Sequence, residues 1–127
     1  NDFDSITVTL KGANNEIVTI INSRRAAYGY DQRLEAFGSD GMLIASNVTP
    51  TTVQHFNAQH AEQRESYIDN FLELYAVAYR RELALFVEGV HTGTQHTPTF
   101  DDGRAALILA DAAHESARTG KAVKVSV

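Results

Sequence analysis

A change of hydrophobic periodicity near Ser66 divides this sequence into two parts. Before Ser66, apolar residues recur at every second position in short stretches, which is the period of β-strands. After it they recur every three to four positions, which is the period of α-helices. Strands, then two helices, then one closing strand predict an α+β domain rather than a doubly wound parallel sheet. We expect an open, mostly antiparallel or mixed β-sheet with two main helices packed on one face.

The first part of the chain contains four segments with a clear strand pattern and a fifth with a weaker one. Ser5–Leu10 alternates cleanly and is joined to Ile17–Ile21 by a turn rich in glycine and asparagine, so the two predict a hairpin. Gln32–Phe37 and Met42–Ser46 flank a Gly-Ser-Asp-Gly turn and predict a second pair. Thr51–Phe56 favours an edge strand because threonine and valine suit a pleated surface.

The segment Ile17–Ile21 is apolar on both of its faces. Ile17 and Ile21 share one face, whereas Val18 and Ile20 point to the other. A strand of this kind is covered on both sides. We therefore expect one face of the sheet to be an oligomer interface, covered by another subunit.

Two helices are predicted in the second part. The first follows an apolar stripe over Ser66–Val90, and its first residue can pair with Asp69 as a cap. The second runs over Thr99–Thr119, begins with the capping signature Thr-x-x-Asp and ends before Gly120. Alternating valines over Val123–Val127 then predict the closing strand.

The composition narrows the class of protein. Residues 1–127, of which 43% are hydrophobic and 21% charged, predict one domain with one core that needs neither metal nor disulfide. Cysteine is absent, which excludes disulfides, thiol nucleophiles and cysteine metal sites and fits a cytoplasmic location. A net charge of -5 gives no attraction to nucleic acid. No apolar run approaches the ~20 residues of a membrane span.

The histidines do not predict a metal site. Two pairs share the same spacing: His55 with His60, and His91 with His96. Neither pair has the four-residue helical spacing of a zinc protease motif or an evident carboxylate as third ligand, so we expect solvated loop residues. His114 falls on the inner stripe of the second helix and is expected to be a partly buried packing residue, with Asp111 as an ordinary helix neighbour.

The connection Asn22–Arg33 combines polar, cationic and aromatic residues between two predicted strands, where functional residues often lie. Tyr28 and Tyr30 offer hydroxyls for hydrogen bonds and flat rings that can pack on the carbon face of a polyol ring. The other interpretation is a strand crossover whose arginines pair with Asp31 and Glu35. The residues alone leave both interpretations open.

At this connection the sequence resembles the Gfo/Idh/MocA oxidoreductase family, and within it the inositol 2-dehydrogenases. The resemblance is carried by Asn-Ser-Arg-Arg-Ala-Ala-Tyr-Gly-Tyr-Asp-Gln-Arg at 22–33 and continues through Phe37-Gly-Ser-Asp-Gly-Met42. Tyr75-Ala-Val-Ala-Tyr-Arg-Arg-Glu82 and the ending from Asp102-Gly-Arg-Ala-Ala-Leu onward are similar to the same family. The resemblance spans nearly the whole chain and is weakest at 48–64.

The resemblance implies that this chain is the C-terminal substrate-binding and oligomerisation domain of an enzyme. Its parent would oxidise a ring hydroxyl of myo-inositol or a related polyol to a ketone with NAD, and would be a homo-oligomer built through the sheet. The family's Gly-rich nucleotide loop, Glu-Lys-Pro lysine and Asp-x-x-x-His pair have no matching positions here. No catalytic, cofactor-binding or metal-binding residue is therefore expected in this chain, which should be inactive without an N-terminal dinucleotide-binding domain.

Two residues carry over as substrate-binding groups: Tyr30 and, less directly, Tyr28. They would orient hydroxyls from the C-terminal side of the inositol pocket, because a tyrosine with an ordinary pKa of ~10 is a poor base at neutral pH. A second interpretation is a free-standing, non-catalytic oligomerisation or polyol-binding module. The sequence starts without methionine and enters a strand pattern almost at once, which favours the first interpretation.

Overall fold

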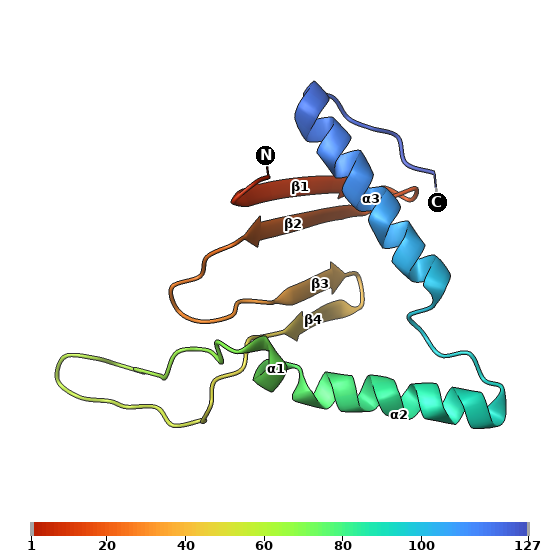
Figure 1. The fold of residues 1–127 in the computed structure, drawn as a ribbon. Helices are drawn as coiled ribbons and strands as arrows, with labels where there is room; N and C mark the ends of the chain where they lie inside the picture. Colours follow the sequence, from red (N-terminus) through yellow and green to blue (C-terminus); the bar gives the residue numbers. More distant parts are fainter. Residues whose placement is uncertain (1, 127) are drawn as a thin grey trace. The chain divides into compact units, whose positions relative to one another are not determined.

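The computed structural model describes residues 2–126 and contains two β-hairpins followed by helices (Figure 1). The strands are β1 (Ser5–Lys11), β2 (Ile17–Ser23), β3 (Leu34–Gly38) and β4 (Gly41–Ala45). The helices are α1 (Phe71–Leu74), α2 (Ala76–Thr92) and α3 (Phe100–Thr119). The predicted open α+β class is confirmed, and the strands pair as two small antiparallel sheets, β1 with β2 and β3 with β4.

The chain divides into two compact units. One unit comprises the residues up to Ile6 together with Ile21–Tyr79, and the other comprises Thr7–Ile20 together with the residues from Arg80 on. The first unit contains β3, β4, α1 and the long connections on either side of the β3–β4 hairpin. This first unit carries the candidate site.

The two hairpins form where the alternating patterns predicted them. In the second hairpin, Leu34 lies opposite Ala45, Phe37 opposite Met42 and Gly38 opposite Gly41. Gly41 has φ of 140°, a backbone conformation open to glycine but strained for other residues, so it permits the tight turn. In the first hairpin the Gly12 N–H donates to the Glu16 carbonyl at 2.8 Å.

Helix α3 begins and ends as its sequence predicts. The Thr99 hydroxyl accepts from the Asp102 N–H at 3.2 Å, and the Asp102 carboxylate accepts from the Thr99 N–H at 2.7 Å, which completes a capping box. Gly120 ends the helix in the left-handed conformation with φ of 67°. Both ends therefore follow from local chemistry.

The predicted helix start at Ser66 is wrong. The helical region begins at Phe71, where the Asn70 side chain accepts from the Leu72 N–H at 2.9 Å, and Tyr75 interrupts it between α1 and α2. The residues before Asn70 are extended because their backbone pairs with other segments: the Ile68 N–H donates to the Val48 carbonyl at 3.1 Å. This pairing between distant segments overrides the local helical period.

Two predicted strands are also wrong within the described residues. Thr51–Phe56 forms no strand, and its backbone pairs only at the isolated bridge between His55 and Gln63. The Thr51 hydroxyl instead donates to the Glu65 carboxylate at 2.7 Å, which ties the segment into a loop. The predicted closing strand is not formed over 123–126, where the valines have no partner strand among residues 2–126. The last residue of that prediction, Val127, lies outside the described residues.

The predicted core is absent from the described residues, because none of them is buried. Large apolar side chains lie open instead, among them Phe100, Phe37 and Leu43 with exposed fractions of 88%, 84% and 77%. His114 is likewise exposed rather than partly buried, since the stripe of α3 on which it lies has no buried residue. His91 lies in the last turn of α2 and not in a loop. Among the described helices, none is long and apolar enough to cross a membrane.

Candidate functional site

The connection between β2 and β3 is held against the segment before α1 by backbone hydrogen bonds. The Tyr67 N–H donates to the Tyr28 carbonyl at 3.0 Å, and the Tyr30 N–H donates to the Ile68 carbonyl at 3.2 Å. Gly29 lies between the two tyrosines with φ of 112°. A Cβ atom on Gly29 would lie 2.4 Å from the Tyr67 carbonyl oxygen, so only glycine allows this close approach.

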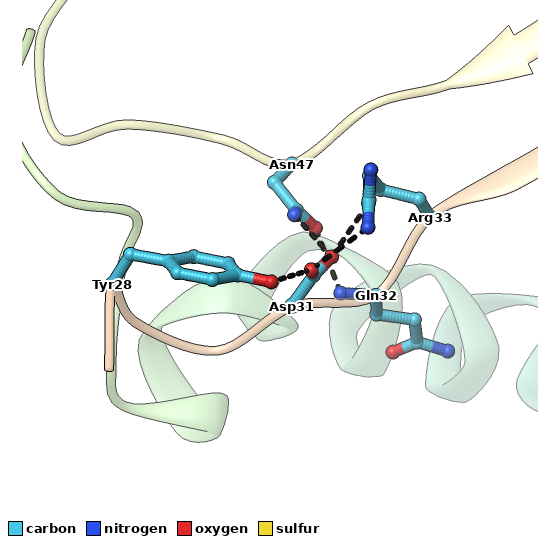
Figure 2. A network of polar contacts seen from close by, with 5 residues as sticks. All are labelled: Tyr28, Asp31, Gln32, Arg33 and Asn47. Atoms are coloured by element: carbon cyan, nitrogen blue, oxygen red, sulfur yellow. Dashed lines mark hydrogen bonds and ion pairs between the residues drawn. The ribbon is translucent and has the colours of Figure 1, made fainter. Parts of the chain in front are cut away.

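Asp31 is the centre of a polar network in this connection, as Figure 2 shows. Its Oδ2 atom accepts from the Tyr28 hydroxyl at 2.6 Å and from Arg33 Nη2 at 3.1 Å. Its Oδ1 atom accepts from Arg33 Nε at 2.8 Å and from Asn47 Nδ2 at 2.5 Å. Each carboxylate oxygen thus has two donors, and the Asp31 side chain is only 16% exposed.

Asn47 joins the network to the residues after β4. While its amide nitrogen donates to Asp31, its Oδ1 atom accepts from the Gln32 N–H at 2.7 Å (Figure 2). The two ends of one side chain therefore fix both the Asp31 carboxylate and the backbone that follows it. This double contact brings together residues that are sixteen positions apart.

The network shifts the pKa values of Asp31 and Tyr28 in opposite directions. The hydrogen bonds from Tyr28, Asn47 and Arg33 lower the pKa of Asp31 to about 2. The same contact, a hydroxyl that donates to a carboxylate, raises the pKa of Tyr28 above its ordinary value. At neutral pH Asp31 is therefore ionised and Tyr28 keeps its proton.

A cavity of about 520 Å³ lies beside the network, within the first unit. Each residue that lines it carries a hydroxyl, amide, carboxylate or guanidinium group: Tyr28, Asp31, Arg33, Ser46, Asn47, Thr49, Arg64, Glu65, Ser66 and Tyr67. The volume falls in the range of about 300–1,000 Å³ usual for small-molecule sites. A wall with this many hydrogen-bond donors and acceptors suits a small ligand rich in hydroxyls.

The structure places the two predicted substrate-binding tyrosines differently. Tyr28 lines the cavity, and its ring meets Tyr67 edge-on at a centroid distance of 5.8 Å. Tyr30 is not among the residues that line it, and its ring meets Tyr75 edge-on at 5.9 Å. Partial burial, together with the neighbouring Tyr30, raises the pKa of Tyr75. Tyr30 thus packs against a second aromatic side chain beside α2.

The interpretation of the connection as an arginine-paired crossover also holds in part. Arg33 pairs with Asp31 as expected, whereas Arg24 pairs with Asp2. Among the described residues, Glu35 has no ion pair. Arg33 and Asp31 therefore form the predicted ion pair and also line the cavity. The crossover and the binding site do not exclude each other.

The sequence did not predict the part of the cavity wall that is formed by Asn47, Thr49 and residues 64–67. The resemblance at 22–33 indicated only the side of the cavity formed by the β2–β3 connection, since the resemblance is weakest at 48–64 and the segment 57–64 is polar without a clear period. The histidine pairs contribute nothing to this wall. No group of three or more histidine, aspartate or glutamate side chains in the part of the chain described by the structure could hold a metal ion.

Comparisons with known proteins agree on one family. Residues 1–126 match the family model described as "Oxidoreductase family, C-terminal alpha/beta domain", the C-terminal domain of the Gfo/Idh/MocA proteins. A protein named myo-inositol 2-dehydrogenase from Thermotoga maritima is 40% identical over 98% of this chain and 37% of its own length. An inositol 2-dehydrogenase from Rhizobium meliloti is 37% identical over 98% of this chain and 38% of its own length.

The solved structures lead to the same result. A crystal structure titled as a myo-inositol dehydrogenase from Corynebacterium glutamicum superimposes with a TM-score of 0.93 at 50% identity, over 99% of this chain and 38% of that one. Another, titled as a putative myo-inositol dehydrogenase from Sinorhizobium meliloti, gives 0.92 at 36% identity, over 97% of this chain and 37% of that one. This chain therefore spans less than two fifths of the length of these relatives.

Proposed function

This chain belongs to the Gfo/Idh/MocA oxidoreductase family, whose C-terminal alpha/beta domain it matches, and from this we propose that it is the substrate-binding part of an NAD-dependent inositol 2-dehydrogenase. The parent enzyme, meaning the longer polypeptide that would carry this chain at its C-terminal end, oxidises a ring hydroxyl of myo-inositol or a related polyol to a ketone. The observation that carries the proposal is the cavity beside Tyr28, whose lining residues all carry polar groups, in a chain whose relatives bear the name inositol 2-dehydrogenase.

The proposed division of labour leaves cofactor chemistry to another domain. NAD would accept the hydride, but the described residues do not fit its phosphates: Gly38 and Gly41 form the turn between β3 and β4 rather than a strand-to-helix loop. This chain alone is therefore inactive in the proposal. Its own residues bind the polyol, orient its hydroxyls and shield the ring from water.

The tyrosines supply the proposed contacts on the C-terminal side of the polyol. Tyr28 presents its hydroxyl at the cavity wall, and Tyr30 lies two residues further on, held by Tyr75. In the proposal their hydroxyls form hydrogen bonds with the polyol and do not take the substrate proton. The acid-base pair of the reaction would come from the domain that precedes this one.

We also propose that the parent enzyme is a homo-oligomer in which β2 lies at a subunit interface. Its apolar side chains are open on both faces: Ile17 and Ile21 are 65% and 75% exposed, and Val18 and Ile20 are 47% and 41% exposed. Exposed apolar side chains that are contiguous mark interaction sites. The open apolar surface of the chain disfavours a free-standing module, which would need a core of its own.

Replacing Tyr30 with phenylalanine in the parent enzyme tests the proposed role of this residue. The loss of one hydroxyl contact to a bound polyol should lower kcat/KM for myo-inositol by roughly 5- to 150-fold, which corresponds to about 1–3 kcal/mol. The affinity for NAD should stay within about twofold, since the cofactor site lies elsewhere. NADH formation at varied inositol and NAD concentrations separates the two effects.

The matched control is Tyr79→Phe in the same enzyme. Tyr79 belongs to the same aromatic row, with its ring 6.3 Å from Tyr75, but it lies on α2 and not in the connection between β2 and β3. It should leave the inositol response unchanged. An inositol response that is equally unchanged in Tyr30→Phe would remove Tyr30 from the site.

A further inference from the structure

The hydrogen bonds at Asp31 determine what the Tyr28 hydroxyl can offer to a ligand. The Tyr28 proton is directed to Asp31 Oδ2 at 2.6 Å. A phenol has one proton, so a hydroxyl that donates to Asp31 can only accept a hydrogen bond from anything else in the cavity. Tyr28 thereby becomes an acceptor on the cavity wall.

Asp31 itself is not available to a ligand. Both of its oxygens already accept two hydrogen bonds, from Tyr28 and three nitrogen atoms of Arg33 and Asn47. A carboxylate has about four acceptor positions, and all four are used. The carboxylate therefore acts on the cavity through Tyr28.

The donors around Asp31 also fix its orientation. Arg33 holds both oxygens in a forked pair, and Asn47 is itself anchored by the Gln32 N–H. Rotation of the carboxylate would break several hydrogen bonds at once. The direction of the Tyr28 proton is therefore set before any ligand enters.

We propose that Asp31 is a positioning residue that fixes the Tyr28 hydroxyl as a hydrogen-bond acceptor and thereby selects ligands that present a hydroxyl donor at that point. The inference rests on the proposed function, because it takes Tyr28 to contact the polyol. It adds a rule of specificity: one hydroxyl of the polyol is recognised through its proton. An analogue that can only accept at this position is rejected.

Singly fluorinated deoxy-inositols test this rule in the parent enzyme, because fluorine replaces a hydroxyl at similar size and cannot donate. For the wild type, one ring position should show a loss in kcat/KM on the order of tenfold to a hundredfold, as expected when a polar partner is left unpaired. In Asp31→Asn the amide can donate to the Tyr28 oxygen, which frees the Tyr28 proton. The loss at that position should then shrink to within about threefold. The intrinsic effect of fluorine on the chemical step cancels, because it is the same in both enzymes.

Three further variants separate selection from a general structural effect. Tyr28→Phe should abolish the discrimination, and Tyr28→Phe combined with Asp31→Asn should match Tyr28→Phe alone. Asp40→Asn removes the same charge at the β3–β4 turn, where the carboxylate accepts from the Ser39 hydroxyl at 3.1 Å, and should keep the wild-type pattern. A loss in Asp31→Asn that is uniform over all analogues would overturn the proposal.

A second readout does not depend on inositol turnover. Fluorotyrosine incorporated at position 28 reports the ionisation of this phenol by ¹⁹F NMR, and its pKa should fall when Asp31 is replaced by asparagine. The other charged or titratable groups at this wall are Arg33, Arg64, Glu65 and Tyr67, which both enzymes share.

The kinetics and the pKa of position 28 together distinguish a failure of the Asp31 role from a failure of the proposed function. An unchanged pKa in an enzyme that oxidises inositol would overturn the role of Asp31 and leave the proposed function intact. A shifted pKa in an enzyme that does not oxidise inositol would overturn the proposed function, and the selection rule with it.

Discussion

Gly29→Ala in the parent enzyme should destabilise the cavity wall and sharply lower inositol turnover. The backbone at Gly29 has φ of 112°, and an added Cβ would meet the Tyr67 carbonyl oxygen at 2.4 Å. Strain in this backbone region costs about 1–3 kcal/mol before the clash is counted. The strand-like pairing of Tyr28 and Tyr30 with residues 67 and 68 must then open.

We therefore expect kcat/KM for inositol to fall by at least tenfold and the free energy of unfolding by at least about 1 kcal/mol, measured by steady-state kinetics and urea denaturation. Gly38→Ala is the matched control, because a Cβ there meets nothing within 4 Å. It should leave both quantities near their wild-type values. Equal effects of the two substitutions would show that the approach of Gly29 to Tyr67 is unimportant.

The isolated chain should fail to unfold cooperatively, whereas the parent enzyme should show a sharp transition. None of the described residues is buried, and Phe37 and Phe100 are more than four-fifths exposed. Burial of apolar surface is the main term that offsets the loss of chain entropy, and two-stranded sheets are at best marginal without it. In the proposed parent enzyme, another part of the polypeptide or other subunits would cover this apolar surface.

Urea titration followed by circular dichroism, together with binding of a dye specific for exposed apolar surface, measures this difference. The isolated chain should give a broad, sloping curve and bind the dye strongly, or associate with itself. The parent enzyme should bind little dye. A cooperative transition of a monomeric isolated chain would mean that it forms a core of its own, and the free-standing module would then be favoured.

Local patterns predicted the elements that are stabilised locally. The hairpins at 5–23 and 34–45 follow from alternation and turn residues, and α3 follows from the Thr99 and Asp102 capping box and from Gly120. Each of these signals acts over a few residues. They can therefore be recognised in a single sequence.

The elements that depend on distant partners were predicted wrongly. The residues before Asn70 have a helical period, but their N–H and carbonyl groups pair with segments twenty to forty positions away. The edge strand at 51–56 and the closing strand at 123–126 lack a partner strand among the described residues. A periodic pattern describes which face is apolar but does not name the segment that covers it.

The candidate site likewise combines residues that local sequence predicts with residues that depend on distant contacts. Tyr28 and Tyr30 could be chosen from the sequence because aromatic and cationic residues gather in one connection that resembles a known family. Asn47 could not, since its role depends on a contact with Asp31 across sixteen positions. The cavity wall at 64–67 could not either, because its position depends on the backbone pairing of Tyr67 with the distant Tyr28.

NADH formation with myo-inositol, measured on the parent enzyme beside this chain alone, tests the central claim most directly. The parent enzyme should reduce NAD only when inositol or a related polyol is present, and this chain alone should give no NADH. A parent enzyme without polyol-dependent NADH formation, or activity from residues 1–127 by themselves, would contradict the assignment.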